Sequence, residues 1–167
     1  KAAYTFMFCH PGKKLLFMGQ EFGQLREWSE ERELDWFLLG EEKHRDLKDF
    51  VQALLKMYRK YPALYGMDND PSGFEWINAN DGDRSIFSFV RKSPTGRNNL
   101  LVVCNFTPVD RPDYRVGVPK KKQYTQILNE NGMTSKKIFK AEKQDCDNRP
   151  FSFTYPLPAY GVAIFQY

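Results

Sequence analysis

The sequence has few residues of the kinds that hold metal ions or build disulfide frameworks. Only three of its 167 residues are cysteine and two are histidine. Cys9, Cys104 and Cys146 are odd in number and have no CxxC spacing, so free thiols in a reducing compartment are expected. His10 and His44 have no partners at the spacing of metal ligands, so no metal site is expected.

Long apolar runs and dense basic stretches are also lacking. No apolar run reaches the roughly 18 residues that a membrane helix needs, and no signal peptide is visible. We therefore expect a cytoplasmic protein with no membrane partner. The net charge is +4, and the lysines form short clusters at 13–14, 120–122 and 136–137, beside Gly, Pro or Ser. Such clusters indicate solvated loops rather than a nucleic-acid groove.

Aromatic residues, in contrast, are abundant at 16% of the chain. Large rings fill the cores of β-sandwiches or form flat platforms for sugars and bases, and burial in a core is the larger energy for each ring. The length suits one compact domain, or one domain with part of another attached.

The first third of the chain has an αβ pattern. Residues 2–9 are apolar and end at a helix-stopping Pro-Gly pair, and residues 14–18 are typical of a short buried strand. A loop with short turns follows over 19–40, a length that is usually functional. Residues 41–60 form the clearest helix, whose predicted apolar face consists of Leu47, Phe50, Val51, Leu54, Leu55 and Tyr58.

After residues 68–73 the pattern changes to that of an all-β domain. Strands are predicted near 74–78, 85–92, 99–106, 113–117, 123–129, 151–155 and 161–166. The polar, lysine-rich stretch 132–150 is predicted to be an excursion loop. Several short strands separated by turns indicate an antiparallel sandwich. The predicted fold is therefore mainly β, with one part at 1–66 and a complete all-β domain at 67–167.

Several motifs in series resemble one enzyme family. They are "HPGKKLLFMGQEFGQLREW" at 10–28, "LDWFLL" at 34–39, "DPSGFEW" at 70–76, "FVRK" at 89–92, "VVCNFTPV" at 102–109 and "DYRVGVP" at 113–119. Their order resembles the C-terminal portion of 1,4-α-glucan (glycogen or starch) branching enzymes of the α-amylase family. The resemblance implies that 1–66 is the last β/α unit of a (β/α)8 barrel, with 15–18 as its eighth strand, and that 67–167 is the C-terminal β-sandwich.

The resemblance also implies a reaction. Branching enzymes cleave an α-1,4-glucan chain and transfer it to an α-1,6 position by a retaining double displacement on carboxylates, without a cofactor. The family's last catalytic aspartate lies in a His-Asp-Glu motif, and this chain has no His-Asp pair. We therefore expect no catalytic residue here, an inactive chain on its own, and the catalytic carboxylates in an N-terminal part of the same polypeptide.

The residues expected to contact glucan are Glu21, Arg26, Trp28 and Trp76. An alternative for Glu21 is an ion pair with Arg26 or Arg32 that holds the loop, and Arg26 has the same structural alternative. Trp28 could stack on glucose or pack within the loop.

Trp76 matches an outer-surface glucan position of the family or is a sandwich-core residue. Trp36 is predicted to be buried under the loop, and Asp35 to cap the turn after it.

Two other functions fit the same residues. One is a stand-alone carbohydrate-binding module, which would bind glucan through Trp76. The other is a fragment of an amylase-type glycoside hydrolase. The predicted partners are α-glucans, the rest of the polypeptide, and other copies of the chain through apolar surface left exposed on 1–66.

Overall fold

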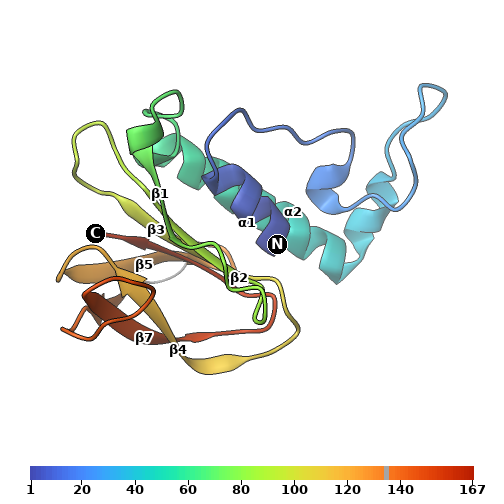
Figure 1. Cartoon of the computed structure of the whole chain (residues 1–167). Helices are drawn as coiled ribbons and strands as arrows, with labels where there is room; N and C mark the ends of the chain where they lie inside the picture. The colour runs from blue at the N-terminus through green and yellow to red at the C-terminus, as the bar shows by residue number, and fades with distance from the viewer. Residues whose placement is uncertain (134–135) are drawn as a thin grey trace.

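The protein is described here by a computed structural model that covers residues 1–133 and 136–167 (Figure 1). The helices are α1 (Ala2–Cys9) and α2 (Glu42–Lys60), with 3-10 turns η1 (Gln20–Phe22), η2 (Trp36–Gly40), η3 (Pro62–Leu64) and η4 (Pro71–Gly73). The strands are β1 (Phe74–Asn78), β2 (Ile86–Arg91), β3 (Leu100–Asn105), β4 (Arg111–Val118), β5 (Gln123–Asn129), β6 (Lys137–Lys140), β7 (Phe151–Leu157) and β8 (Val162–Gln166). The seven strands that the sequence predicted are thus confirmed within a few residues.

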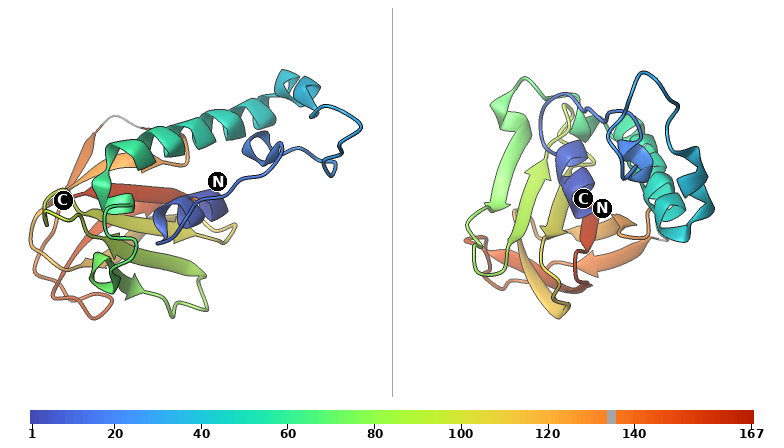
Figure 2. Two further views of the ribbon diagram at one scale, coloured as in Figure 1. Left: turned by 90° about the horizontal axis from the view of Figure 1, so that it is seen from above. Right: turned by 90° about the vertical axis from the view of Figure 1, so that its right-hand side faces the viewer.

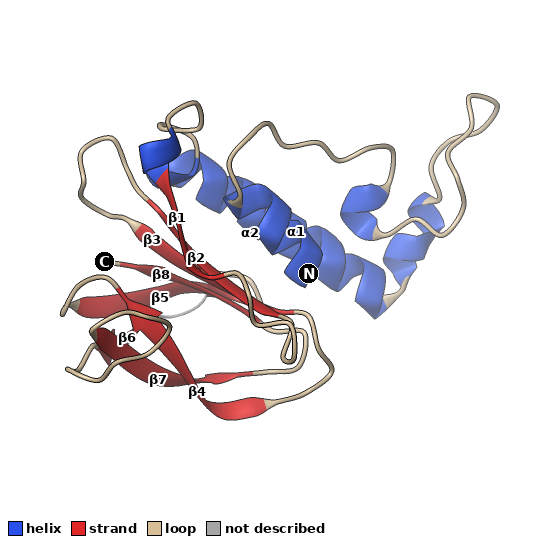
Figure 3. Ribbon diagram, viewed as in Figure 1, coloured by secondary structure: helices blue, strands red, loops and turns tan. Residues whose placement is uncertain are grey.

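The strands form two antiparallel sheets. A six-stranded sheet has the order β1-β2-β3-β8-β5-β6, and β4 pairs with β7 in a two-stranded sheet. The helices cover one face of the larger sheet and the smaller sheet covers the other, which gives three layers (Figure 3). β3 and β8 lie at the centre and are almost wholly apolar and buried, as expected for strands covered on both faces.

Each interface between layers has its own apolar core. Because successive side chains of a strand point to opposite faces of the sheet, β3 contributes residues to both cores. Val102 and Cys104 face the helices, in one cluster with Phe8, Leu54 and other residues of both helices. Leu101 and Val103 face β4 and β7, in a cluster with Phe153 and Tyr155. The antiparallel sandwich is therefore confirmed, and the helices share a core with its larger sheet.

The helices explain how the first third of the chain is attached. α1 is apolar on all sides, which suits its position between α2 and the sheet. The buried face of α2 is the predicted apolar face with one correction. Leu55 is half exposed, and Met57, which was not predicted, is buried. None of the helices in the described part of the chain is long and apolar enough to cross a membrane.

Two sequence predictions about secondary structure were wrong. Residues 14–18 form no strand; Met18 already lies in a turn with a φ of 33°, and Leu15 is 75% exposed. A strand needs a neighbour to pair with, and no strand in the described ranges lies beside this segment. The predicted loop 132–150 contains β6, an edge strand that pairs with β5. Residues 134–135 of that stretch lie outside the described residues.

Candidate functional site

The segment from Phe17 to Gly40, here called the rim segment, lies at the end of α2 farthest from the β-sandwich (Figure 2). Its first turn depends on two glycines with left-handed backbone, Gly19 at φ 88° and Gly23 at φ 72°. They flank η1, where the Tyr4 hydroxyl donates to the Gln20 carbonyl at 2.8 Å. The segment is thereby tied to α1, although it has little regular structure of its own.

An Arg–Asp pair organises the middle of the rim segment. The Arg26 guanidinium donates to Asp35 through Nε, at 2.9 Å from Oδ2, and through Nη2 to Oδ1. The Asp35 amide donates to Gln24 Oε1 at 2.8 Å, and Gln24 Nε2 donates back to the Arg26 carbonyl at 3.0 Å. The hydrogen bond from Arg26 lowers the pKa of Asp35, so this carboxylate stays ionised well into acid.

This pair corrects two predictions. Asp35 makes no side-chain cap at η2, because both of its oxygens are held by Arg26. Glu21 is in none of the ion pairs formed by the described residues, while Arg32 donates to the Glu27 carbonyl at 2.6 Å. Glu21 lies near Tyr4, whose pKa is raised by burial and further by this carboxylate.

A cavity of about 340 Å³ opens on the rim segment and is lined by Phe17, Met18, Gln20, Gln24, Arg26, Glu27 and Trp28. Trp28 is partly exposed and meets the Phe17 ring edge to face, with centroids 5.3 Å apart. The structure thus brings Arg26 and Trp28 together at one cavity. Trp36 lies instead on Phe22 at 5.2 Å with half of its surface exposed, so the prediction that it is buried was wrong.

The lining of this cavity limits its chemistry. Glu27 is its one carboxylate, whereas cleavage of a glycosidic bond uses two. Nor do the described residues contain a cluster of three or more side chains suited to a metal ion. An arginine fork, two amides and a partly exposed indole can bind hydroxyl-rich ligands.

Trp76 lies at the edge of an aromatic cluster and is not in the core between the two sheets. Its side chain leaves β1 on the helix-facing side of the sheet, at the edge of an aromatic cluster with Phe74, Phe89 and His10 at centroid distances of 5.0, 5.6 and 6.0 Å. It is 37% exposed and lies outside the core between the two sheets, so the sandwich-core interpretation was wrong. Its carbonyl accepts from Arg149 at 2.9 Å.

Comparison with known proteins agrees with this architecture. Residues 76–167 match the family model described as alpha amylase, C-terminal all-beta domain. The chain belongs to this family. The matched stretch runs from Trp76 in β1 to the last described residue. It contains both sheets except for the first two residues of β1, and the rim segment precedes it.

Similarity to curated proteins also includes the first third of the chain, which the family model does not match. The 1,4-alpha-glucan branching enzyme GlgB of Butyrivibrio fibrisolvens is 51% identical over all of this chain and 27% of its own length. The enzyme of the same name from Aquifex aeolicus is 43% identical over all of this chain and 28% of its own length. The chain therefore spans about a quarter of the length of these relatives.

A solved structure shows the same fold at much lower identity. The type I pullulanase of Bacillus subtilis, in complex with maltose, superposes on 99% of this chain and 22% of its own, with a TM-score of 0.70 and 12% identity. The superposition includes α1, the rim segment and α2 together with the sheets. Their arrangement is therefore found in a second, distantly similar protein.

Proposed function

We propose that this chain is the C-terminal part of a 1,4-α-glucan branching enzyme, whose whole polypeptide cleaves α-1,4-glucan chains and transfers them to α-1,6 positions. The observation that supports this most is the 51% identity to a branching enzyme across the entire chain, rim segment included. Identity limited to the β-sandwich would support only a shared accessory domain. The family match by itself covers 76–167.

In this proposal the rim segment forms part of the glucan-binding cleft. Arg26 and Trp28 line its cavity, and the Asp35 pair holds the guanidinium with its remaining N–H groups free for sugar hydroxyls. Glu21 lies in η1, next to Gln20 of the cavity, and forms no ion pair with the described side chains. It is the third glucan contact of the rim segment. Trp76 is a separate glucan contact on the β-sandwich.

The catalytic carboxylates of the retaining double displacement belong, in this proposal, to the rest of the polypeptide. The rim cavity contributes one carboxylate, Glu27, which leaves the acid/base and nucleophile unassigned here. Residues 14–18 would become the eighth barrel strand once strands of the remaining polypeptide lie beside them. Residues 1–66 would then complete a barrel, with 67–167 as the C-terminal domain of a cytoplasmic enzyme that uses no cofactor.

The test begins with an immunoblot of source cells using an antibody to this chain. A band about four times heavier than 19.6 kDa is expected, since the chain spans about a quarter of the relatives. The protein in that band, once purified, should raise the α-1,6 content of amylose, measured by proton NMR, with little gain in reducing ends. A gain in reducing ends without new α-1,6 bonds would identify the amylase-type hydrolase instead.

A second candidate, the stand-alone carbohydrate-binding module, is favoured by the partial exposure of Trp76 beside other aromatic rings. A band at 19.6 kDa in the same blot would favour the binding module over the branching enzyme. Glucan binding by the isolated chain would then be its whole activity.

A further inference from the structure

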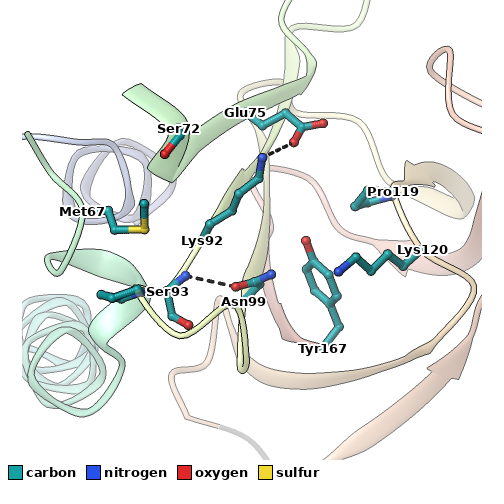
Figure 4. Close-up of a pocket in the computed structure, with 11 residues that line it drawn as sticks. Met67, Ser72, Glu75, Lys92, Ser93, Asn99, Pro119, Lys120 and Tyr167 are labelled. Atoms are coloured by element: carbon teal, nitrogen blue, oxygen red, sulfur yellow. Dashed lines mark hydrogen bonds and ion pairs between the residues drawn. The ribbon is translucent and has the colours of Figure 1, made fainter. Parts of the chain in front are cut away.

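A second cavity, here called the Tyr167 pocket, lies in the β-sandwich and has no part in the proposed glucan contacts (Figure 4). Its volume is about 490 Å³, and its walls come from the chain around η4, the ends of β1 and β2, the β2–β3 loop and the β4–β5 turn, with Tyr167 at one side. Its β1 residue is Glu75, whose side chain leaves the strand on the face opposite Trp76. The pocket and the Trp76 cluster are thus separate surfaces.

Hydrogen-bond donors dominate the pocket. The ammonium groups of Lys92 and Lys120 both reach it. Asn99 accepts from the Ser93 amide through Oδ1 at 3.0 Å, so its amide nitrogen is left to face Tyr167, as Figure 4 shows. Burial raises the pKa of Tyr167 to about 12, so its hydroxyl keeps its proton at neutral pH and can donate.

The one carboxylate in the pocket is already occupied. Glu75 binds Lys92 Nζ through Oε2 at 2.7 Å and Arg149 through Oε1 at 2.8 Å. Lys120 appears in none of the ion pairs of the described residues. Donors and positive charge therefore exceed acceptors and negative charge, which is the balance that a bound oxyanion requires.

The size of the pocket indicates more than an inorganic ion. Small-molecule sites occupy about 300–1,000 Å³ and combine apolar walls with a few polar groups. Tyr167, Pro94, Pro119 and Met67 supply such walls beside the two lysines. We propose that the Tyr167 pocket binds the phosphate monoester of a small sugar, with the phosphate on Lys120 and Lys92 and the sugar ring against Tyr167.

The test is isothermal titration calorimetry on the full 167-residue chain with glucose 6-phosphate, inorganic phosphate and maltotriose as separate probes. Glucose 6-phosphate is expected to bind most tightly of the three, and more weakly as salt is added. Equal affinity for inorganic phosphate would overturn the sugar-phosphate assignment. So would tighter binding of maltotriose, which would make the pocket a neutral-glycan site.

Three variants localise the binding. Lys120→Gln should lower the affinity for glucose 6-phosphate by about tenfold, because it removes a charge-assisted contact to the phosphate. The fold should tolerate it, because Lys120 supports the structure through its carbonyl, which accepts from the Tyr124 hydroxyl at 2.9 Å. Lys121→Gln, the same charge change on a residue that does not line the pocket, is the matched control and should leave affinity unchanged.

The third variant, Glu75→Gln, should raise the affinity for glucose 6-phosphate instead of lowering it. Loss of this carboxylate frees Lys92, so glucose 6-phosphate should bind several times more tightly. Circular dichroism of each variant would establish that it is folded. An unchanged affinity in folded Lys120→Gln, or weaker binding in folded Glu75→Gln, would overturn the proposal.

Discussion

Arg26 and Asp35 form a two-pronged ion pair across the rim segment, with the carboxylate 4% exposed and the guanidinium open to the cavity. This geometry makes Arg26 both a structural and a ligand-binding residue, since its fork has more donors than one carboxylate can use. The pair closes the eight residues between the partners into one loop.

We expect Asp35→Ala to loosen the rim segment. Its Arg26 partner would be released, and trypsin should then cleave after Arg26 and Arg32 several times faster than in the unchanged chain. Glu33→Ala removes an exposed carboxylate nearby and is the matched control. Equal cleavage rates in the two variants would show that the ion pair does not hold the segment.

The same pair should give a distinct pH dependence. Its hydrogen bond lowers the pKa of Asp35 below the ordinary value of 3.8. The stabilisation is therefore fully present above that value, and it is lost as the pH falls through the lower pKa of the folded state. The carboxyl carbon chemical shift of Asp35, followed by NMR, should still be mainly that of the ionised form at pH 3.8 and should change only at lower pH. A titration midpoint at or above 3.8 would contradict the lowered pKa.

Replacing Arg91 should destabilise the whole chain. Its buried guanidinium donates to the Cys9 carbonyl at 2.6 Å, to the Leu64 carbonyl at 3.1 Å and to the Asp68 carboxylate, and so joins α1, η3 and the following loop to β2. Arg91→Met should lower the free energy of unfolding by about 3–5 kcal/mol, the usual cost of breaking a buried ion pair. Urea denaturation measures this. Arg97→Met, at an exposed site, should change it by less than about 0.5 kcal/mol.

Gly117 allows the close approach of two segments of the β domain. A Cβ there would lie 2.2 Å from the Cys146 carbonyl oxygen, and the Gly117 amide donates to Asp147 Oδ2 at 2.8 Å. Gly117→Ala must displace backbone and should cost about 1–3 kcal/mol of unfolding free energy. Gly82→Ala meets nothing within 4 Å and is the control. Similar denaturation midpoints for both variants would refute the contact.

Trp76→Ala tests the glucan contact on the β-sandwich. If the indole stacks on a sugar, affinity electrophoresis in amylose gels should show binding weakened by about tenfold. Tyr160→Ala, which removes another exposed aromatic ring of the same domain, should bind as the unchanged chain does. Full binding by a folded Trp76→Ala variant would remove Trp76 from the proposed glucan contacts.

Apolar surface on the rim segment should drive self-association of the isolated chain. Leu25 and Phe37 of this segment are 79% and 73% exposed, and exposed apolar surface is where chains commonly associate. Sedimentation velocity should show oligomers whose fraction grows with protein concentration. These oligomers should be absent from the double variant Leu25→Glu, Phe37→Glu. Val109→Glu changes an exposed apolar residue of the β domain and should leave them unchanged. A monomer at all concentrations would count against self-association.

The sequence by itself determined most of the regular structure. A strand such as β3 carries a continuous apolar run, and α2 carries an apolar stripe of helical period, and both patterns follow from local geometry alone. It did not reveal β6, because this edge strand has lysines at both ends and little buried surface, as edge strands exposed to solvent commonly do. The Tyr167 pocket had no sequence signal, since its walls come from segments separated by up to a hundred residues.

Only the tertiary structure decided which partner each polar or aromatic side chain takes. The sequence pointed to a rim loop with Arg26 and Trp28, but not to Asp35 as the partner of Arg26, because two residues nine apart in a loop have no periodic relationship. It left both an outer-surface glucan contact and a sandwich-core position open for Trp76, and the pleat of β1 turns this side chain toward α1. Residues 14–18 have the composition of a buried strand, but a strand forms only where a neighbouring strand accepts its hydrogen bonds.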